Sequence, residues 1–247
     1  MQWETIQALN AINREFYQTV ADEFHETRGK PWPGWVILYP YLVHQARDKT
    51  LAALDVGCGN GRFAAFLHGN LESPLLYHGM DNNAALLDHA AQDLGALPRL
   101  TVTLEQRDVV MTPPDHGEYD LVVLFGLIHH IPGNDYRREF MRKMAERVKP
   151  GGLLIFACWR FYEYERFRQR ILPWPEDLAE MVEPQDYLLD WRRGETETGA
   201  PAQRYCHYVD DAEHQALVAA TQLQEIHSFR ADGFTNTVNR YSVLQRR

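Results

Sequence analysis

The segment Leu51–Phe63, LAALDVGCGNGRF, constrains the fold of this chain more than any other. A short apolar run leads into Asp55, and glycines follow at alternate positions, Gly57, Gly59 and Gly61. Short apolar runs bounded by glycine are typical of buried strands in parallel sheets. Glycine is needed where a strand turns sharply into a helix and the backbone approaches a ligand. The segment therefore predicts a strand, a ligand-binding turn and a following helix.

Further apolar runs alternate with helical patterns along the chain. The runs of strand type are residues 75–80, 100–106, 119–126 and 153–159, the last following the turn sequence Lys149–Gly152. Helical spacing covers 84–94, and a second helix is expected from an Asn134 cap through Met144. This alternation predicts an α/β fold with a doubly wound, Rossmann-like parallel sheet.

The last part of the chain completes that sheet. A helix is expected from Asp210 or Asp211 through Leu223, followed by strands at 224–229 and 241–245. The connection between these two strands is short, which predicts an antiparallel pair. The sheet should therefore hold seven strands, mostly parallel with one antiparallel strand.

Two segments outside this alternation are expected to cover the ligand site. Residues 3–24 have one apolar helical stripe, and a second helix is expected after Pro33. We expect both helices to form a lid across the strand ends, where open α/β sheets bind ligands. Residues 160–204, after the fifth strand, are rich in charges, prolines and aromatics and are expected to form an insertion that caps the substrate.

Length and composition indicate the domain organisation of the chain and the kinds of ligand to expect. The 247 residues fit a single domain, with a lid at 1–50, a cofactor-binding core at 51–159, the cap at 160–204 and a C-terminal helix and strand pair at 205–247. No apolar run is long enough for a membrane span, and scattered cysteines indicate free buried thiols in the cytoplasm. The histidines and cysteines lack metal-ligand spacing, so no metal is expected. The net charge of −9 does not favour unaided binding of nucleic acid.

Acidic residues follow the second and third strands, Asp81 and Asp108. An acid about 20 residues after a glycine turn can accept both ribose hydroxyls of a nucleoside. Position 62 is arginine, so the third glycine of the dinucleotide pattern is missing. The sequence Asp-x-Gly-x-Gly-x-Gly resembles motif I of the class I S-adenosylmethionine-dependent methyltransferases. That resemblance implies S-adenosylmethionine as the cofactor. Its expected contacts are Asp55, Gly57, Gly59, Gly61, Asp81, Asn82, Asp108, Val109 and Phe125.

Three further segments resemble the wobble-uridine tRNA carboxymethyl methyltransferases, which esterify 5-carboxymethyluridine in the anticodon. They are ETRGKPWPGW at 26–35, FGLIHHI at 125–131 and RYCHYV at 204–209. The resemblance implies that Arg28, His130 and Arg204 face the acceptor, while Trp32, Tyr205 and His207 shape the pocket. It also implies tRNA as a partner and, for members with a eukaryotic-type function, a small zinc-containing partner protein.

The residue types are consistent with this chemistry without the family. A carboxylate is already an ionised nucleophile at neutral pH, so its methylation needs positioning and no general base. The planar fork of arginine suits that positioning. Two alternatives stay open, a small-molecule O- or N-methyltransferase and a protein that binds the cofactor without turnover. The intact glycine turn with Asp81 and Asp108 argues against the second.

Overall fold

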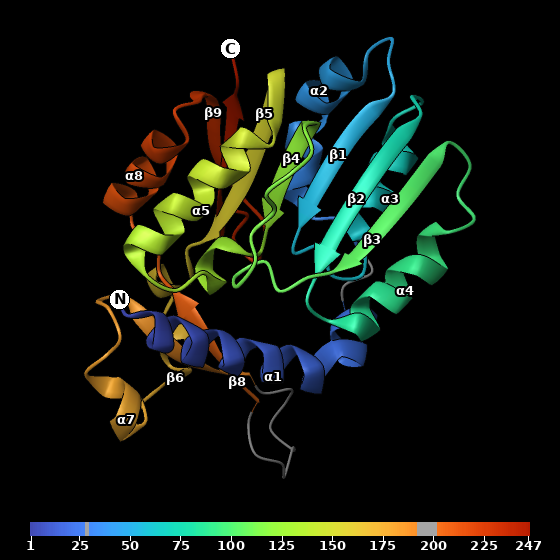
Figure 1. Cartoon of the computed structure of the whole chain (residues 1–247). Coiled ribbons are helices and arrows are strands. Elements are labelled where there is room, and N and C mark those ends of the chain that lie inside the picture. The colour runs from blue at the N-terminus through green and yellow to red at the C-terminus, as the bar shows by residue number, and fades with distance from the viewer. Residues whose placement is uncertain (28–29, 192–201) are drawn as a thin grey trace.

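The computed structural model describes residues 1–27, 30–191 and 202–247 (Figure 1). Its central sheet has seven strands in the order β3-β2-β1-β4-β5-β10-β9. The first five strands are parallel, and β10 is antiparallel to both of its neighbours. This confirms the expected class I methyltransferase sheet. The strands are β1 Leu51–Val56, β2 Leu75–Asp81, β3 Leu100–Gln106, β4 Tyr119–Phe125, β5 Val148–Trp159, β9 Gln224–Ala231 and β10 Asn239–Gln245.

Helices cover both faces of the sheet because successive side chains of a buried strand point to opposite faces. In β4, Val123 belongs to the apolar core on one face, and Val122 and Leu124 belong to the core on the other. The first core includes side chains of α2 Pro33–Ala46, α3 Arg62–Asn70 and α4 Ala84–Leu94. The second includes side chains of α5 Asn134–Glu146 and α8 Asp211–Thr221.

The helix α1 Trp3–Thr27 lies across the carboxyl ends of β1, β2 and β3, as Figure 1 shows. This is the lid position expected for the N-terminal helix. The expectation that α2 shares that position is wrong. Trp35, Leu38 and Leu42 of α2 are buried in the core on the α3 face of the sheet. Burial of this apolar stripe fixes α2 against the sheet face, and only its first turn, with Pro33 and Trp35, reaches the cavity at the strand ends.

The segment after β5 forms a small cap with a sheet of its own, a feature that its irregular sequence did not predict. The cap sheet has the order β6-β7-β8 and is antiparallel. Its strands are β6 Ile171–Leu172, β7 Asp186–Trp191 and β8 Ala202–His207. The short helices are η1 Ile128–His130, before the cap, and η2 Phe161–Glu163, α6 Glu165–Arg168 and α7 Glu176–Ala179 within it. Cap and α1 lie at the same end of the sheet (Figure 1).

Two local expectations are corrected. Asn134 does not cap α5, because Gly133 occupies the N-cap position and the Asn134 backbone N–H donates to Glu183 Oε2 of the cap at 2.7 Å. The turn expected at 149–152 lies within β5, where the pairing with β4 shifts register and Gly151 has φ +77°. Asp210 caps α8 as expected, accepting from the Glu213 backbone N–H. Cys58, Cys158 and Cys206 are buried free thiols. None of the described helices is long and apolar enough to cross a bilayer.

Gly34 provides a test of how α2 is fixed. A Cβ at this position would lie 2.4 Å from Tyr241 Cζ, and the Gly34 N–H donates to Asp232 Oδ1 at 2.7 Å. We expect Gly34→Ala to lower the free energy of unfolding by about 1–3 kcal/mol through overpacking. The matched control is Gly69→Ala in α3, where nothing lies within 4 Å, and it should be neutral or stabilising. Urea unfolding of both variants measures the difference, and equal midpoints would contradict the expectation.

Candidate functional site

The turn after β1 has the backbone geometry that its glycines allow. Gly57 and Gly59 have φ values of +80° and +54°. The N–H groups of Gly57 and Cys58 both donate to the Met80 carbonyl, which joins the turn to the end of β2. No Cβ at 57 or 59 stands between this backbone and the space above the strand ends, so a ligand can lie directly against it.

Asp55 and Asp81 face this turn from adjacent strand ends. Asp55 Oδ2 accepts from the Tyr77 hydroxyl at 2.6 Å, and burial raises the pKa of Asp55 from 3.8 to about 7. Asp81 accepts from the backbone N–H groups of Gly59 at 2.8 Å and Asn83 at 3.0 Å. Burial also raises the pKa of Asp81, and these two hydrogen bonds oppose that shift.

Asp108, after β3, is already in contact with the lid helix. Its Oδ2 accepts from Asn10 Nδ2 at 2.7 Å and lies 3.6 Å from Arg14 Nη1. Its Oδ1 accepts from the backbone N–H of Val110. A carboxylate oxygen has more than one acceptor site, so Asp108 can still receive an amino group from a ligand in the cavity.

These residues line one cavity of about 510 Å³, within the size range of small-molecule sites. The cavity lies between the strand ends, α1 and the cap. Most residues that the sequence nominated line it. They are Trp32, Asp55, Gly57, Gly59, Asp81, Asn82, Asp108, Val109, Phe125, His130 and Arg204.

The other nominated residues do not line the cavity, and one lies outside the described residues. Gly61 is the N-cap of α3, with φ +74°. A Cβ there would lie 2.7 Å from Leu94 Cδ1, so this glycine permits close approach of α3 and α4. The expected cofactor contact is therefore replaced by a packing role. Arg28 falls in the undescribed residues 28–29.

Tyr205 and His207 are buried side chains that hold the cap, which corrects their expected place in the acceptor pocket. The Tyr205 hydroxyl donates to Asp186 Oδ1 at 2.8 Å. The His207 ring lies between two carboxylates, with Nδ1 2.7 Å from Asp186 Oδ1 and Nε2 2.6 Å from Glu213 Oε2. Through these two contacts the buried His207 ring connects β7 to α8.

His130 lies at the cavity wall with both ring nitrogens occupied. Nδ1 lies 2.9 Å from the Tyr205 carbonyl oxygen and 3.1 Å from Asn13 Nδ2. Nε2 lies 3.0 Å from the Tyr17 hydroxyl oxygen. Burial, together with the charge of Arg204, lowers the pKa of His130 to about 3. His130 is therefore neutral at physiological pH and holds Tyr17 of the lid.

Arg204 brings a positive charge into the cavity without an ion-pair partner among the described residues. Its guanidinium carbon lies 4.7 Å from the Trp159 ring centroid and 5.4 Å from that of Phe16. The Nε atom is buried and has no hydrogen-bond partner in the described part of the chain. Stacking between two aromatic rings holds the cation in place, and its donors remain available to an anionic ligand.

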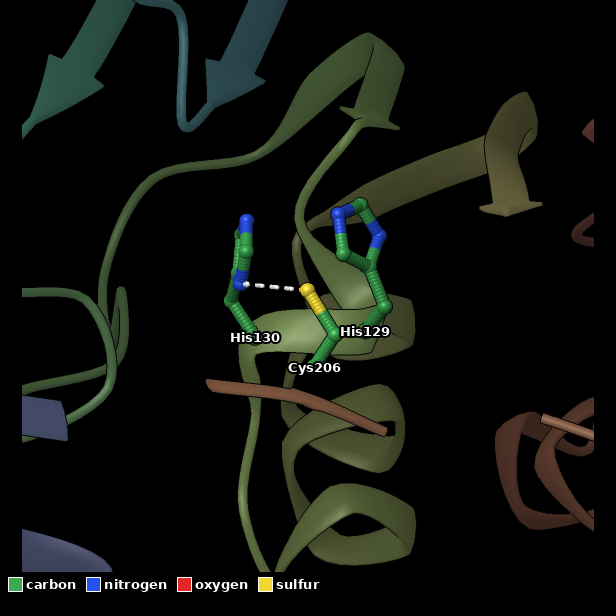
Figure 2. Close-up of side chains that lie close together, drawn as sticks. All are labelled: His129, His130 and Cys206. Carbon is green, nitrogen blue, oxygen red and sulfur yellow. Dashed lines mark hydrogen bonds between the residues drawn. The ribbon is translucent and has the colours of Figure 1, made fainter. Parts of the chain in front are cut away.

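His129, His130 and Cys206 form the one cluster in the described chain with metal-ligand chemistry (Figure 2). Their potential ligand atoms lie within 4.8 Å of one another, and His130 Nδ1 is 4.0 Å from Cys206 Sγ. One feature disfavours a cation. The guanidinium of Arg204 adds to the burial that lowers the pKa of both histidines, and the same positive charge would repel a metal ion.

Several cavity residues escaped the sequence analysis. Asn10, Asn13 and Tyr17 lie on one face of α1, and the two asparagines are buried. Asn13 Oδ1 accepts from the Tyr205 backbone N–H at 2.8 Å. The sequence signal for these residues was a polar side chain at each of positions 10, 13 and 17, on the helical stripe that also carries Ile6 and Leu9. Other missed wall residues include Arg62, Leu127, His129, Trp159, Arg166, Phe167, Arg170, Asp190 and Asp232.

The cavity wall fits a positively charged nucleoside such as S-adenosylmethionine. Acids stand at three strand ends, and the bare backbone of Gly57 and Gly59 can approach a flat ligand. Asp81 faces the cavity where a ribose would present hydroxyl donors, and Asp55 could balance an ammonium group. The cations at the opposite wall, Arg204, Arg166 and Arg170, can hold an anionic second substrate.

Residues 54–154 match the family model described as a methyltransferase domain. The chain is 27% identical over 144 residues to the tRNA (carboxymethyluridine(34)-5-O)-methyltransferase of Saccharomyces cerevisiae, a match that covers 58% of this chain and 46% of that protein. The chain thus spans about half the length of this relative. It is 23% identical over 215 residues to the Schizosaccharomyces pombe protein of the same name, covering 77% and 86% of the two chains.

A solved S-adenosylmethionine-dependent methyltransferase from Clostridium acetobutylicum has the same fold, with a TM-score of 0.64 at 14% identity. The similarity covers 94% of this chain and 98% of the other. At this level of identity, the likeness confirms the expected fold and carries no information on the acceptor.

The raised pKa of Asp55 predicts a pH-dependent affinity for S-adenosylhomocysteine. The carboxyl is protonated below pH 7 in the free protein, and a bound ammonium group favours its ionised form. The affinity should therefore rise up to about tenfold per pH unit below pH 7 and level off above it. Calorimetry at pH 6 in two buffers should show proton release. Asp55→Asn should remove both effects and the exposed control Asp88→Asn neither. A flat affinity from pH 5.5 to 8 would contradict the role.

The same shift makes a stability prediction with a defined sign. Because the folded-state pKa of Asp55 lies above its unfolded value of 3.8, its contribution to stability is present at low pH and is lost as the pH rises through 7. In the ligand-free protein, Asp55→Asn should gain stability relative to the parent chain between pH 5 and 8. Thermal unfolding at both pH values measures the difference, and the opposite trend would rule it out.

We expect the histidine–cysteine cluster to hold no metal. Protein purified without chelator should contain less than about one tenth of a zinc ion per chain by elemental analysis, because an adjacent guanidinium disfavours a cation. Activity should survive dialysis against a chelator. Stoichiometric zinc that disappears in Cys206→Ser would contradict this expectation.

Proposed function

We propose that this chain, which has the sheet of the class I methyltransferase fold and matches a methyltransferase domain over residues 54–154, transfers the methyl group of S-adenosylmethionine to a carboxylate, that of 5-carboxymethyluridine at the wobble position of a tRNA anticodon. The product is the methyl ester. The cofactor side of the cavity is the turn after β1 with Asp55, Asp81 and Asp108, and the acceptor side is the wall formed by α1 and the cap.

The observation that carries the proposal is the unpaired guanidinium of Arg204. A cation among aromatic rings, with a buried Nε and no carboxylate partner in the described chain, has lost hydration without full compensation. An acceptor carboxylate would supply both the charge and the missing hydrogen-bond acceptors. Arginine also fixes such a group in orientation, because its planar fork binds two oxygens at once.

The state of His130 agrees with a reaction that needs no base. When bound, the cofactor supplies an electrophilic methyl group. A carboxylate has no proton to lose at neutral pH, so the protein has only to exclude water and align one oxygen. Both ring nitrogens of His130 are engaged, Nδ1 by Asn13 and the Tyr205 carbonyl and Nε2 by the Tyr17 hydroxyl. With a pKa lowered to about 3, the ring is a weak base that holds the lid. Positioning of this kind supplies up to about 7–11 kcal/mol in well-aligned cases.

The names of two relatives support the tRNA acceptor. Both the Saccharomyces cerevisiae and the Schizosaccharomyces pombe proteins are tRNA carboxymethyluridine methyltransferases. Arg28, which the structure does not describe, is proposed as a second carboxylate anchor on the sequence resemblance alone. The small zinc-containing partner expected for eukaryotic-type members also stays a proposal.

The anchor is tested by substituting Arg204. We expect Arg204→Lys and Arg204→Ala to slow single-turnover methylation of carboxymethyluridine RNA by about 100-fold each, because a point charge cannot replace the two-pronged contact. The dissociation constant for S-adenosylhomocysteine should change less than about twofold, since its contacts come from the strand ends. The control is Arg142→Lys, on the exposed surface of α5. Full activity in Arg204→Ala, with unchanged melting temperature, would exclude the anchor.

The acceptor itself is tested by mass analysis of tRNA nucleosides from a deletion strain. We expect carboxymethyluridine to accumulate and its methyl ester to disappear, and expression of the parent chain to restore the ester. An unchanged nucleoside profile would exclude the tRNA role. It would favour the alternative of a small-molecule O- or N-methyltransferase, whose acceptor would then be sought among acidic metabolites.

A further inference from the structure

A cationic, aromatic edge lies where the cavity opens between the cap and the β9–β10 connection. It consists of Arg166, Phe167, Arg170 and Phe234, here called the cap rim. The first three line the cavity, and so does Gly233, the neighbour of Phe234. The side chain of Phe234 is 55% exposed, which is unusual for a phenylalanine in the described part of the chain.

The charges of the cap rim are not neutralised within the described chain. Other arginines nearby are paired: Arg160 and Arg230 both contact Glu163. Arg166 and Arg170 have no ion pair with a described carboxylate, and the guanidinium of Arg166 lies 4.7 Å from the Phe234 ring centroid. In a chain of net charge −9, two unpaired cations at a cavity mouth mark a local site for an anion.

The rings of the cap rim continue inward to the proposed anchor. Phe234 and Phe167 have centroids 6.4 Å apart, and Phe167 meets Trp159 at 4.9 Å. Trp159 in turn contacts the Arg204 guanidinium at 4.7 Å. A continuous path of aromatic faces and cations therefore leads from the exposed surface to the acceptor wall. Alternating aromatic rings and cations is the chemistry by which proteins hold single-stranded nucleic acid.

We propose that the cap rim binds the nucleotide next to the acceptor, with Arg166 and Arg170 on the flanking phosphates and the adjacent base stacked on Phe234. The inference rests on the proposed function and deepens it, because it requires the acceptor to arrive within an RNA strand. It also accounts for an acidic protein acting on RNA. The phosphate contacts are few and local, and exposed charges farther away than about 8 Å are largely screened at physiological salt.

The test measures RNA binding separately from methyl transfer. A labelled anticodon stem-loop with unmodified uridine at the wobble position is titrated with the full chain and S-adenosylhomocysteine, using fluorescence anisotropy from 50 to 250 mM salt. The variants are Arg166→Gln with Arg170→Gln, and Phe234→Ala. The matched control is Arg138→Gln with Arg142→Gln, which removes the same charge from the exposed face of α5.

The double cap-rim variant should weaken binding about tenfold and reduce the slope of log affinity against log salt by about 1.4, the value for two single-strand phosphates. Phe234→Ala should weaken binding about fivefold or more through lost stacking, with little change in slope. The α5 control should stay within about twofold of the parent chain. A cap-rim double variant that matches the α5 control in both affinity and slope overturns the proposal.

A second measurement separates failure of the cap rim from failure of the proposed acceptor. Steady-state methylation is compared between a stem-loop carrying carboxymethyluridine and the free carboxymethyluridine nucleoside. The cap-rim variants should raise KM for the stem-loop and leave the kinetics with the free nucleoside unchanged. If neither substrate is methylated by the parent chain but the binding differences hold, the cap rim stands and the acceptor is wrong. If both substrates are methylated and respond equally to the variants, the cap rim is wrong and the acceptor stands.

Discussion

The carboxylate of Asp81 is the contact on which the rest of the site depends. It accepts from Gly59 in the turn after β1 and from Asn83 at the start of α4. Asn83 also caps α4 and donates to the Tyr17 carbonyl of α1. The Tyr17 hydroxyl continues to His130. One run of hydrogen bonds thus connects the glycine turn, a sheet helix, the lid and the wall of the acceptor side, so the cofactor contacts and the lid position are set together.

The lid helix transmits this arrangement to the cap through buried asparagines. Asn10 contacts Asp108 after β3, and Asn13 contacts the backbone of Tyr205 in β8. A buried polar side chain is stable only where its hydrogen bonds are made, so each asparagine fixes the register of α1 against one partner. The helix is therefore held at both sides of the cavity. Movement of α1 would disturb the strand-end side and the cap side of the cavity at once.

The charge distribution inside the cavity is divided between its two sides. Acids from three strand ends face the cofactor side, where burial raises the pKa of Asp55 and Asp81. Cations from the cap, Arg204 with Arg166 and Arg170, face the opposite wall. A positively charged ligand and an anionic acceptor would each find the complementary side, which orients them toward one another. The net charge of the whole chain does not show this division, because it sums charges without regard to where they lie.

The sequence by itself determined the sheet, the glycine turn and the acids at the strand ends. These follow from local patterns, because apolar periodicity defines each strand and parallel strands bring their carboxyl ends to one edge. Only the tertiary structure decided which polar residues face the cavity. Gly61, Tyr205 and His207 were nominated for the site, but contacts elsewhere engage all three. Gly61 lies in the close packing of α3 against α4. Tyr205 and His207 contact the buried carboxylate of Asp186, and His207 also contacts Glu213.

 For these residues, the direction of a side chain depends on which distant segment packs beside it. The place of Arg204 between Phe16 and Trp159 likewise depends on three segments far apart in the chain, and no spacing within one segment encodes such a meeting.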